Sequence, residues 1–553
     1  MGTRASECGE SGVASRLTRR LVAPDIVTVE QMRRLEAAAA AAGVSERTLQ
    51  ATAARGLAEL AQALGIEPRR DTVVVLVGPG NNGRDAMLAG AHLARRGYRV
   101  ALYLGPRHAV EPDELQGLRA AGARLALHAE AGDQVLDVLD GWLQHASLAI
   151  DGLLGIGARG ALRSPLKEAA ERLNRARQER RGTLRVLAVD IPSGIDADDG
   201  GVEGVAVQAD VTAALGAVKA GTLRFPAAEF VGELICLGID LPPSASEPDA
   251  PRVLDPAAVA SLVPSRDPAG HKGSMGKVLV VGGSHLYLGA PILSALGAAR
   301  SGCGLVALAV PSPVRQAAAV AIPEATYLGE VDPERDPDGA AAVVAERLGE
   351  FEALLVGPGL GRSDNAGRFV RALLSTYLPA TRTPTVVDAD ALYVLARWGA
   401  WWEQVPSYLV LTPHHGEMSR LSGQPIEQVA QENWIAAQRA AEQWRQVVVL
   451  KGPHTVVVVP RERSWVYPRA NPALATAGSG DVLAGLIAGL IAQGADRWDA
   501  ARLGVVAHAL AAQRLVARRR WRSLLASDLC RELPRVLRAL AKAAAASTAP
   551  HLG

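Results

Sequence analysis

Residues 72–83 read Thr72-Val-Val-Val-Leu-Val-Gly-Pro-Gly-Asn-Asn-Gly83. The first six carry no charge and are mostly β-branched, which is typical of a strand buried on both faces of a parallel sheet. A glycine-rich turn follows and leads into a helix, which we expect at 85–96. Because parallel strands need a crossover connection, usually a helix, this stretch predicts an α/β fold.

The alternation of strand and helix continues in both directions from this stretch. Upstream, residues 30–64 have the apolar spacing of helices, with a break near Gly43. Downstream, short apolar runs predict strands at 99–104, 148–150, 184–189, 277–281, 305–310, 353–356, 385–387, 408–411, 447–450 and 455–459. Such alternation predicts doubly wound sheets with helices on both faces, in three αβα layers.

A stretch rich in proline and serine divides the alternation into two halves. It reads Pro242-Pro-Ser-Ala-Ser-Glu-Pro-Asp-Ala-Pro251, a composition typical of linkers. We therefore expect two α/β domains joined by a linker and preceded by a leader. The boundaries that we expect are 1–25 for the leader, 26–242 for the first domain, 243–254 for the linker and 255–545 for the second domain.

Composition and charge exclude several classes of protein. The 553 residues are 49% hydrophobic and 21% charged, which is typical of a globular protein and not of a disordered chain. A net charge of +2 offers no electrostatic reason to bind nucleic acid or an anionic membrane. The four cysteines lie far apart without a CxxC pair, and no run of about 18 apolar residues is free of charge. We expect a cytoplasmic protein without a membrane span.

The glycine turn at Gly78–Gly83 satisfies the pattern G-x-G-x-x-G, which is weak evidence by itself. A dinucleotide-binding domain of the usual kind also needs an acidic residue about 20 positions later, and 98–103 contains none. An ordinary NAD-linked dehydrogenase is therefore disfavoured. The turn instead gathers Asn81, Asn82 and Asp85 at a helix N-terminus. A solvated turn that only caps its helix is the structural alternative.

Two more polar clusters follow predicted strands. Asp151-Gly-Leu-Leu-Gly-Ile-Gly157 follows the strand at 148–150, and Asp190-Ile-Pro-Ser-Gly194 follows the strand at 184–189. The carboxyl ends of parallel strands share one edge of the sheet, where ligands bind. Asn82, Asp151 and Ser193 are thus expected to converge. Oxygen donors with little charge suit a hard cation of low charge density or plain water, and helix capping remains the alternative for each residue.

Together these motifs resemble the NAD(P)H-hydrate epimerases over residues 28–240. The resemblance implies a Rossmann-like domain that interconverts the R and S forms of hydrated NADH or NADPH, with Asp190 as a general acid or base. It implies a potassium ion on Asn82, Asp151 and Ser193. It also implies that the substrate is bound by Asn81, Asn82, Gly83, Arg84, Asp85, Gly155, Ile156, Gly157, Ala158, Arg159, Gly160, Ala161 and Asp190.

This sequence departs from the family pattern in two places. The usual Gly-Gly-Asp-Gly is Gly83-Arg84-Asp85-Ala86 here, and Ala51 and Ala54 stand where the family has glutamate and glycine. Arg84 puts a side chain where glycine would let the backbone approach the ligand, or it supplies a cation for a phosphate. We expect epimerase activity to be retained, with a scaffold role as the alternative.

The second half carries an anion-binding motif. Ala475-Thr-Ala-Gly-Ser-Gly-Asp481 precedes an apolar helix that starts near Val482. Small residues at a helix start leave backbone N–H groups free to bind an anion, and the helix dipole favours negative charge there. Asp481 can take a proton from a hydroxyl while the amides hold a transferring phosphoryl group. The alternative is a carboxylate that only stabilises the helix N-terminus.

Further motifs end the neighbouring strands: 357–361, 388–392, 412–417 and 451–455. With His271–Gly276 and 281–291 they resemble the ribokinase-like fold and, within it, the ADP- or ATP-dependent NAD(P)H-hydrate dehydratases, over 255–535. The resemblance implies nucleotide contacts from Lys451, Gly452, Pro453, His454, Thr455 and Gly480, and hydrate contacts from Ala290, Gly361, His414 and Asp481. Asp481 would be the catalytic base, with ADP as co-substrate and Mg²⁺ on the phosphates. His415 replaces the usual proline.

The two resemblances predict a bifunctional enzyme that repairs hydrated NADH and NADPH (NADHX and NADPHX). The first half would epimerise the hydrate and the second would dehydrate the S form, with release of AMP and phosphate. The partners that we expect are these hydrates, ADP and further copies of the chain, because helices rich in alanine and glycine often pack between subunits. The alternative is a ribokinase-like small-molecule kinase with a non-catalytic nucleotide-binding N-terminal domain.

Overall fold

The computed structural model describes residues 20–106, 112–127, 134–245, 247–519 and 524–548. The chain forms two compact units, Met1–Val253 (unit 1) and Leu254–Gly553 (unit 2). Most of the predicted leader, 1–25, lies outside the described residues. Of the predicted linker, 243–254, residue 246 also lies outside them, and Ala250 is buried in the core of unit 1.

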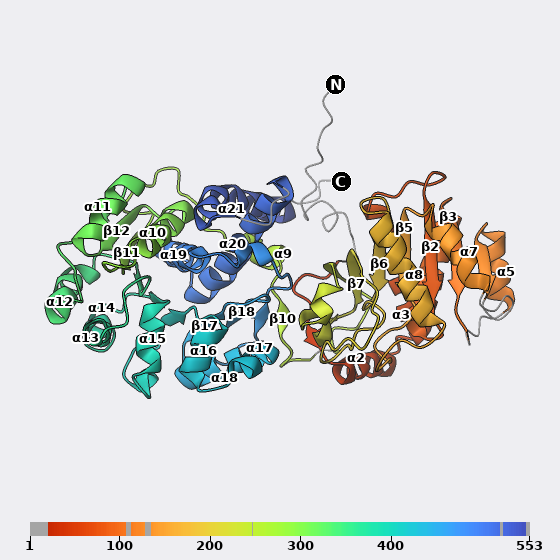
Figure 1. Ribbon diagram of the computed structural model, residues 1–553, viewed down its shortest axis with the longest axis horizontal. Coiled ribbons are helices and arrows are strands. Elements are labelled where there is room, and N and C mark those ends of the chain that lie inside the picture. The colour runs from red at the N-terminus through yellow and green to blue at the C-terminus, as the bar shows by residue number, and fades with distance from the viewer. Residues whose placement is uncertain (1–19, 107–111, 128–133, 246, 520–523, 549–553) are drawn as a thin grey trace, which may run out of the picture. The chain divides into compact units, whose positions relative to one another are not determined.

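Unit 1 is built on a parallel sheet with the strand order β4-β3-β2-β5-β6-β7-β9 (Figure 1). Its strands are β2 (Thr72–Val77), β3 (Arg99–Leu104), β4 (Arg124–Leu127), β5 (Leu148–Gly152), β6 (Arg185–Val189), β7 (Val211–Leu215) and β9 (Glu233–Leu237). After β2 the chain adds β3 and β4 on one side and then returns to place β5 on the other. This reversal creates a crevice at the carboxyl ends of β2 and β5, where open α/β sheets bind ligands.

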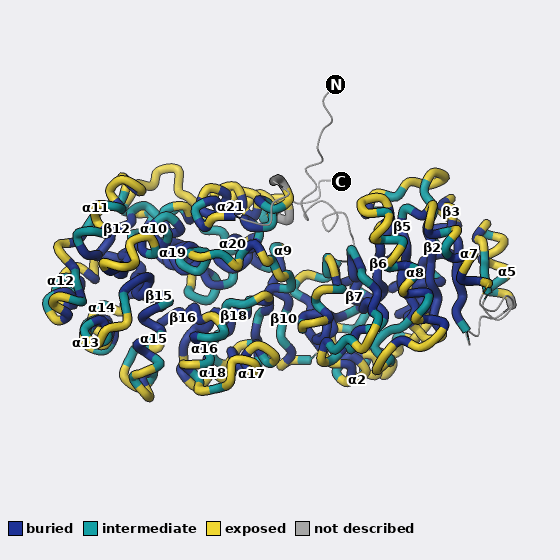
Figure 2. Tube along the Cα trace, viewed as in Figure 1, coloured by how far each residue is buried: buried dark blue, intermediate teal, exposed yellow. Residues whose placement is uncertain are grey.

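Alternate residues of β2 enter two different cores. Val73 and Val75 pack in one core with α2, α3 and α4, whereas Val74 and Leu76 pack in the other with α7 and α8. Successive side chains of a strand point to opposite faces, so a strand apolar throughout needs helices on both. β2 is accordingly buried over almost its whole length (Figure 2). The helices of unit 1 are α2 (Val29–Ala41), α3 (Glu46–Ala63), α4 (Asn81–Arg95), α5 (Pro112–Ala120), α7 (Gln134–Leu143) and α8 (Leu166–Glu179).

A short second pairing completes unit 1. β1 (Ile26–Val27) pairs in parallel with β8 (Val218–Lys219), so that Val27 lies opposite Lys219. β10 (Arg252–Val253) is the last element of the unit. The β1–β8 pair matters for the site because it carries Lys219 next to the carboxyl end of β7.

Unit 2 contains a sheet in which the order runs β19-β18-β17-β16-β15-β14-β11-β12-β13. The strands are β11 (Lys277–Val281), β12 (Leu305–Ala309), β13 (Thr326–Tyr327), β14 (Ala353–Val356), β15 (Thr385–Val387), β16 (Leu409–Leu411), β17 (Val447–Leu450), β18 (Val456–Val458) and β19 (Trp465–Val466). Pairing is parallel from β17 to β13, but β18 and β19 are antiparallel. The turn between β17 and β18 is too short for a crossover helix, so β18 must reverse direction.

The helices of unit 2 flank this sheet. They are α9 (Pro256–Val259), α10 (Gly289–Ser301), α11 (Ser312–Ala321), α12 (Pro337–Leu348), α13 (Asp364–Arg371), α14 (Leu378–Thr381), α15 (Asp390–Ala396), α16 (His415–Ser422), α17 (Ile426–Gln431), α18 (Asn433–Trp444), α19 (Ser479–Ala492), α20 (Arg497–Arg519) and α21 (Ala526–Thr548). Residues 482–492 of α19 are all buried, as expected for a helix that is apolar on every side.

Small residues let α19 approach α10 very closely. A Cβ atom on Gly485 would lie 1.9 Å from the carbonyl oxygen of Ser294, and one on Gly297 would lie 2.4 Å from the carbonyl oxygen of Val482. These contacts fix the position of α19, and therefore of Asp481 in its first turn. The predicted α/β class with mostly parallel sheets is confirmed in both units. No helix within the described ranges is long and apolar enough to cross a membrane.

Candidate active sites

Unit 1 has a cavity of about 690 Å³ at the carboxyl ends of β2, β5 and β6. The turn after β2, the segment after β5 and Asp190 after β6 form its floor, and α2 and α3 form a wall. Of the predicted substrate residues, those that line it are Asn81, Asn82, Asp85, Gly155, Ile156, Gly157, Ala158 and Asp190. Gly83, Arg84, Arg159, Gly160 and Ala161 are not part of the lining.

The glycine turn is shaped by close approaches of the backbone. A Cβ on Gly78 would lie 1.7 Å from the carbonyl oxygen of Leu153, and one on Gly83 would lie 2.1 Å from that of Gly78. Gly80 has nothing within 4 Å of its Cβ position, so it leaves the backbone open towards the cavity that it lines. Two of these glycines therefore serve packing and the third keeps space for a ligand.

Asn82 and Ser193 contact the backbone of Leu154, and Asp151 joins them through Ser193. The Asn82 amide donates to the Leu154 carbonyl (2.8 Å), and the Leu154 N–H donates to Ser193 Oγ (2.9 Å). Ser193 donates through its hydroxyl to one oxygen of Asp151 (2.7 Å) and through its N–H to the other (2.8 Å). Strands 148–152 and 185–189 are adjacent in the sheet, which is why their ends meet.

This oxygen set fits a monovalent cation. Asp151 is fully buried and forms no ion pair among the described residues. Burial raises its pKa to about 6, although the hydrogen bonds from Ser193 and Leu153 act to lower it. A buried carboxylate without a counter-ion is stabilised by a cation. No group of three or more His, Cys, Asp or Glu side chains suited to a metal occurs in the described part of the chain. The Ser193 hydroxyl and the Leu154 carbonyl supply further oxygens next to this carboxylate, and such a set suits an ion of low charge.

Asp190 has an unusual backbone conformation and pairs with a buried lysine. Its φ is +64°, a left-handed value that non-glycine residues rarely adopt. Lys219, 1% exposed, donates to Asp190 Oδ1 (2.5 Å) and to the carbonyl oxygens of Leu215 (2.9 Å) and Ala217 (3.1 Å). These bonds use all three ammonium donors. Lys219 was not among the residues predicted from the sequence, although its single charge within the apolar stretch 211–221 was the available signal.

Asp85 faces the same cavity in a different electrostatic state. The residue is only 8% exposed, and burial raises its pKa to about 8. The negative charges of Asp190, Glu36 and Glu46 also raise this pKa, whereas the positive charge of Lys219 lowers it. The protein atoms around Glu36 likewise raise its pKa by desolvation, although much of its surface is exposed. At neutral pH Asp85 is therefore mostly a neutral carboxylic acid.

The departures from the family pattern are accommodated away from the cavity. Arg84 turns to Glu114 on α5, with 2.6 Å between Nη2 and Oε1, so its guanidinium is engaged there. Arg159 is exposed and lies 3.9 Å from Asp198. Ala54 is part of the core, whereas Ala51 is exposed. The extra side chain at position 84 thus lies outside the space that the lining residues enclose.

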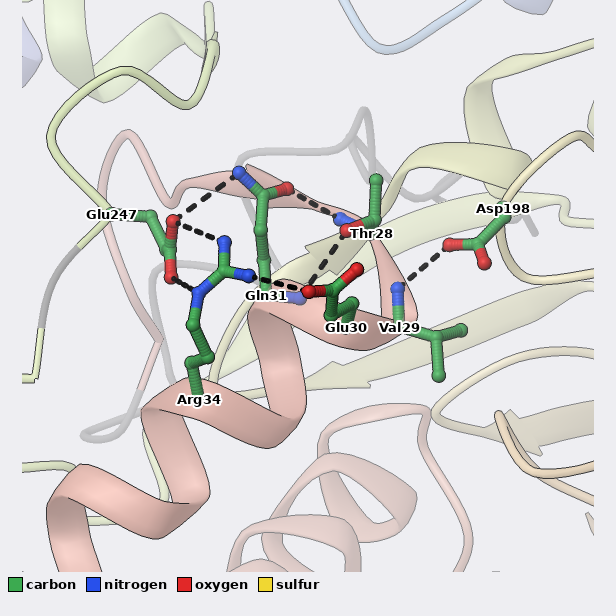
Figure 3. Close-up of polar contacts among 7 residues, drawn as sticks. All are labelled: Thr28, Val29, Glu30, Gln31, Arg34, Asp198 and Glu247. Atoms are coloured by element: carbon green, nitrogen blue, oxygen red, sulfur yellow. Dashed lines mark hydrogen bonds and ion pairs between the residues drawn. The ribbon is translucent and has the colours of Figure 1, made fainter.

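Helix α2 supplies Met32 and Glu36 to the cavity wall and is anchored at its N-terminal end (Figure 3). The backbone N–H of Val29 donates to Asp198 (2.7 Å). Arg34 donates a bidentate pair of hydrogen bonds to the Glu247 carboxylate, from Nε to Oε1 (2.9 Å) and from Nη2 to Oε2 (3.0 Å). Glu247 comes from the predicted linker, so that segment helps to fix the wall of the cavity.

In unit 2 the start of α19 presents backbone amides. Its N-cap, Gly478, has a φ of +86° and no side chain caps the helix. The ammonium of Lys451, in the turn between β17 and β18, would lie 3.2 Å from a Cβ on Gly480. The predicted phosphate-binding turn and the predicted nucleotide turn therefore face each other at contact distance.

Acidic groups surround Lys451 and Asp481. Lys451 Nζ lies 2.7 Å from Asp388, which is 1% exposed, and Glu417 is also buried. Burial alone would lower the pKa of Lys451, but the carboxylates of Asp388 and Glu417 outweigh the effect of burial, so the pKa of Lys451 is raised. Burial raises the pKa of Asp481 to about 7, helped by the charge of Asp388 and opposed by that of Lys451. Asp388 and Glu417 were quoted in strand-end motifs but not selected from the sequence as site residues.

Of the predicted hydrate contacts, His414 adjoins this cluster, with Nε2 3.5 Å from Glu417 Oε1. The N–H of Gly361 donates to Asp390 (3.0 Å), and Ala290 lies against Gly359, whose Cβ position is 3.2 Å from the Ala290 Cβ. His414 caps α16 with Nδ1 accepting from Gly416 N–H (3.0 Å). Partial burial, together with the charge of Lys451, lowers the pKa of His414 to about 4, so its imidazole is neutral.

The side chains of the predicted nucleotide turn, 451–455, do not all lie on the same side of the turn. Thr455 donates back to the carbonyl oxygen of Gly452 (3.2 Å), which closes the turn. His454 is buried with Nδ1 3.3 Å from the carbonyl oxygen of Tyr467, so its ring belongs to the core. The ring of His415 fills the space beside Gly452, because a Cβ there would lie 2.6 Å from His415 Nε2. The turn thus leaves the backbone of 452–455 and the side chain of Lys451 as the groups that could contact a ligand.

Two different family models match the chain, one in each unit. A family model described as NAD(P)H-hydrate dehydratase matches residues 278–535, and one described as YjeF-related protein N-terminus matches 46–221. The chain is 37% identical over 516 residues to the bifunctional NAD(P)H-hydrate repair enzyme Nnr of Salinibacter ruber (89% of this chain, 92% of that protein). It is 35% identical over 496 residues to the protein of that name from Moorella thermoacetica (87% and 90%).

A solved structure is similar to the second half. It is an ADP/ATP-dependent NAD(P)H-hydrate dehydratase from Bacillus subtilis co-crystallised with ATP and Mg²⁺, with 30% identity and a TM-score of 0.45, covering 52% of this chain and 98% of that chain. The sites and the sequence matches define the class as two-unit α/β enzymes in which a YjeF-type N-terminal domain precedes a hydrate dehydratase domain. This chain belongs to the family of bifunctional NAD(P)H-hydrate repair enzymes. The predicted resemblance and enzyme class are confirmed.

Proposed function

We propose that unit 1 interconverts the R and S hydrates of NADH and NADPH and that unit 2 dehydrates the S form at the expense of ADP. The observation that carries the first half is the cavity at the switch point of the sheet, lined by Asn81, Asn82, Asp85 and Asp190. For the second half it is the approach of Lys451 to Gly480 at the start of α19. Family membership over nearly nine-tenths of the chain supports both.

In the epimerase site Asp190 is the proposed proton-transfer group at the hydrated carbon. Both hydrogen bonds that its carboxylate accepts from described residues, from Lys219 and from the N–H of Leu215, end on Oδ1, so Oδ2 is left for the substrate. Asn82, Asp151 and Ser193 would hold potassium, which would offset the buried charge of Asp151 and keep the segment around Leu154 ordered. General acid–base catalysis by such a positioned group contributes about 10²- to 10⁴-fold.

Potassium dependence tests this half directly. We expect epimer exchange to slow markedly when K⁺ is replaced by tetramethylammonium, because the buried oxygen set admits no ion of that size. Ser193→Ala should raise the potassium concentration needed for half-maximal exchange by at least about tenfold. Thr183→Ala, an exposed hydroxyl remote from the cavity lining, is the control and should behave as the parent. Exchange at the full rate without potassium would contradict the proposed ion site.

In the dehydratase site Asp481 is the proposed base. It would take the hydroxyl proton of the hydrate as the oxygen attacks the terminal phosphorus of ADP, and AMP would leave with the electrons of the broken P–O bond. The amides of the first turn of α19 would hold the transferring group. Loss of phosphate from carbon, with loss of a proton from the neighbouring carbon, then restores the ring double bond.

Magnesium is proposed to arrive with the nucleotide. Asp388 is engaged by Lys451, and Asp390 by Arg362, at 2.7 Å in each case. Neither carboxylate is therefore free to build a protein-only site, and Mg²⁺ commonly keeps its ligands on substrate phosphates. When bound, the ion would neutralise charge on the phosphoryl oxygens.

Two further properties belong to the proposal. We place the protein in the cytoplasm, in keeping with its unpaired Cys236, Cys303 and Cys530. We also propose a homo-oligomer, supported by the neighbouring exposed apolar side chains of Leu286 and Tyr287.

A further inference from the structure

Asp85 carries an oxygen that the fold leaves without a partner. The residue is 8% exposed and lines the cavity of unit 1, and its Oδ1 is buried with no hydrogen bond to another described residue. A buried polar atom without a partner destabilises the fold unless something else uses it. Such an atom, on a residue that lines a cavity, indicates a group reserved for a ligand.

The other carboxyl groups on the cavity wall are engaged or exposed. Glu46 is exposed and accepts from the Asn81 amide (2.8 Å), and Glu36 is exposed on α2. Asp190 carries the charge of an ion pair with Lys219. Of these lining carboxyl groups in the described part of the chain, Asp85 is the one with an oxygen that is itself fully buried and accepts no hydrogen bond.

The two buried acids are therefore prepared for opposite tasks. Asp190 forms an ion pair with Lys219. Burial and the negative charges of Asp190, Glu36 and Glu46 oppose the ionisation of Asp85, with Lys219 acting in the opposite sense. Neighbouring titratable groups whose environments favour different protonation states are typical of an acid–base pair.

We propose that Asp85, in its protonated form, is the general acid of the epimerase site and works with Asp190 as the general base. This inference rests on the proposed epimerase function. Asp190 takes the hydroxyl proton of the hydrated carbon, the C–O bond becomes a carbonyl, and the bond from that carbon to the ring nitrogen breaks. The nitrogen receives the electron pair and the proton of Asp85.

Closure on the other face of the aldehyde completes the exchange. The ring nitrogen attacks the carbonyl carbon and returns its proton to Asp85, while Asp190 returns its proton to the oxygen. Both carboxyl groups end in their starting states, so the cycle consumes no external acid or base. Lys219 is a positioning residue in this scheme because it acts through Asp190.

Asp85→Asn tests the inference in the full-length protein. Asparagine keeps the size and an oxygen at this position but cannot give up a proton. We expect exchange of the R and S hydrates to fall by about 100-fold or more towards the spontaneous rate. Binding of the hydrate, measured by calorimetry, should change by less than about threefold, and the melting temperature should not fall, because a neutral side chain replaces a neutral one.

Asp113→Asn on α5, an exposed acid, is the matched control and should exchange epimers at the parental rate. Borohydride added during turnover gives a second readout. It should convert the ring-opened aldehyde of the parent to an alcohol, detected by mass spectrometry as the hydrate plus two hydrogens, and should yield no enzyme-dependent product with Asp85→Asn.

The outcomes separate this inference from the proposed function. If the parent does not exchange epimers, the epimerase function itself is wrong. If the parent exchanges them and Asp85→Asn does so equally fast, Asp85 is not the acid. Loss of hydrate binding in the variant would make Asp85 a binding contact instead, and absence of the trapped alcohol with the parent would overturn the ring-opening step.

Discussion

Replacing Asp481 with asparagine should reduce the rate of S-hydrate dehydration by about 10³-fold, within the range for loss of a general base. The carboxyl group stands in the first turn of α19, next to the amides that would hold the phosphoryl group. An asparagine there keeps the shape of the site but cannot accept the hydroxyl proton. The measurement is the recovery of reduced-nicotinamide absorbance from purified S hydrate with ADP.

The proposed role of Asp481 as a base also predicts how the rate of dehydration changes with pH. A base must be ionised, and the pKa of Asp481 is raised to about 7 by burial and by Asp388, with Lys451 opposing. Asp390 and Glu417 add to the raising. Dehydration by the parent should therefore increase as the pH rises through about 7 and level off above it. The residual activity of Asp481→Asn should lack this rise.

Asp364→Asn is the matched control, because Asp364 is also a first-turn acid of a helix, α13, and is exposed. The substitution removes a favourable charge at a helix N-terminus, which stabilises the helix by about 0.3–1 kcal/mol. It removes no group that has a proposed role in the reaction. It should dehydrate at the parental rate. If Asp481→Asn did the same, Asp481 would be only a stabilising charge at the start of its helix.

Gly485→Ala should lower the free energy of unfolding of unit 2 by about 3 kcal/mol. The added methyl group would lie 1.9 Å from the carbonyl oxygen of Ser294, so α10 and α19 must move apart. Backbone on both sides leaves no flexible side chain to give way. Urea denaturation measures the loss, and dehydration should weaken with it, since α19 positions Asp481.

Gly367→Ala is the control for the same chemical change. Gly367 lies within α13 and has nothing within 4 Å of its Cβ position. Alanine there should stabilise the protein by about 0.5–1 kcal/mol, because it restricts the unfolded chain and favours the helix. Equal effects of the two substitutions would mean that the close approach of α10 and α19 does not hold α19 in place.

Much of the fold could be predicted because the strands are buried on both faces and therefore read as continuous apolar runs. The expected strand at 72–77 coincides with β2, and that at 277–281 with β11. The helix expected at 85–96 begins at Asn81 instead, since the glycine turn itself forms the first turn of α4. The antiparallel direction of β18 was not expected, because an apolar run does not reveal its pairing.

The candidate sites were predictable where function lies at strand ends. Asn82, Asp151 and Ser193 could be brought together from the sequence because parallel strands end at one edge. Lys219 could not, since its position depends on the pairing of β1 with β8. The unpaired oxygen of Asp85 and the inward turn of His454 also follow from packing across distant segments, which a sequence does not specify.

The central claim is that unit 2 uses a nucleotide to remove water rather than to make a stable phosphate ester. The most direct measurement supplies the full-length protein with S hydrate and ADP and records free phosphate and reduced nicotinamide in one reaction. We predict that they appear in equal amounts, with AMP as the other product. Consumption of nucleotide that left phosphate attached to its acceptor, with no reduced nicotinamide formed, would contradict the claim and identify a small-molecule kinase.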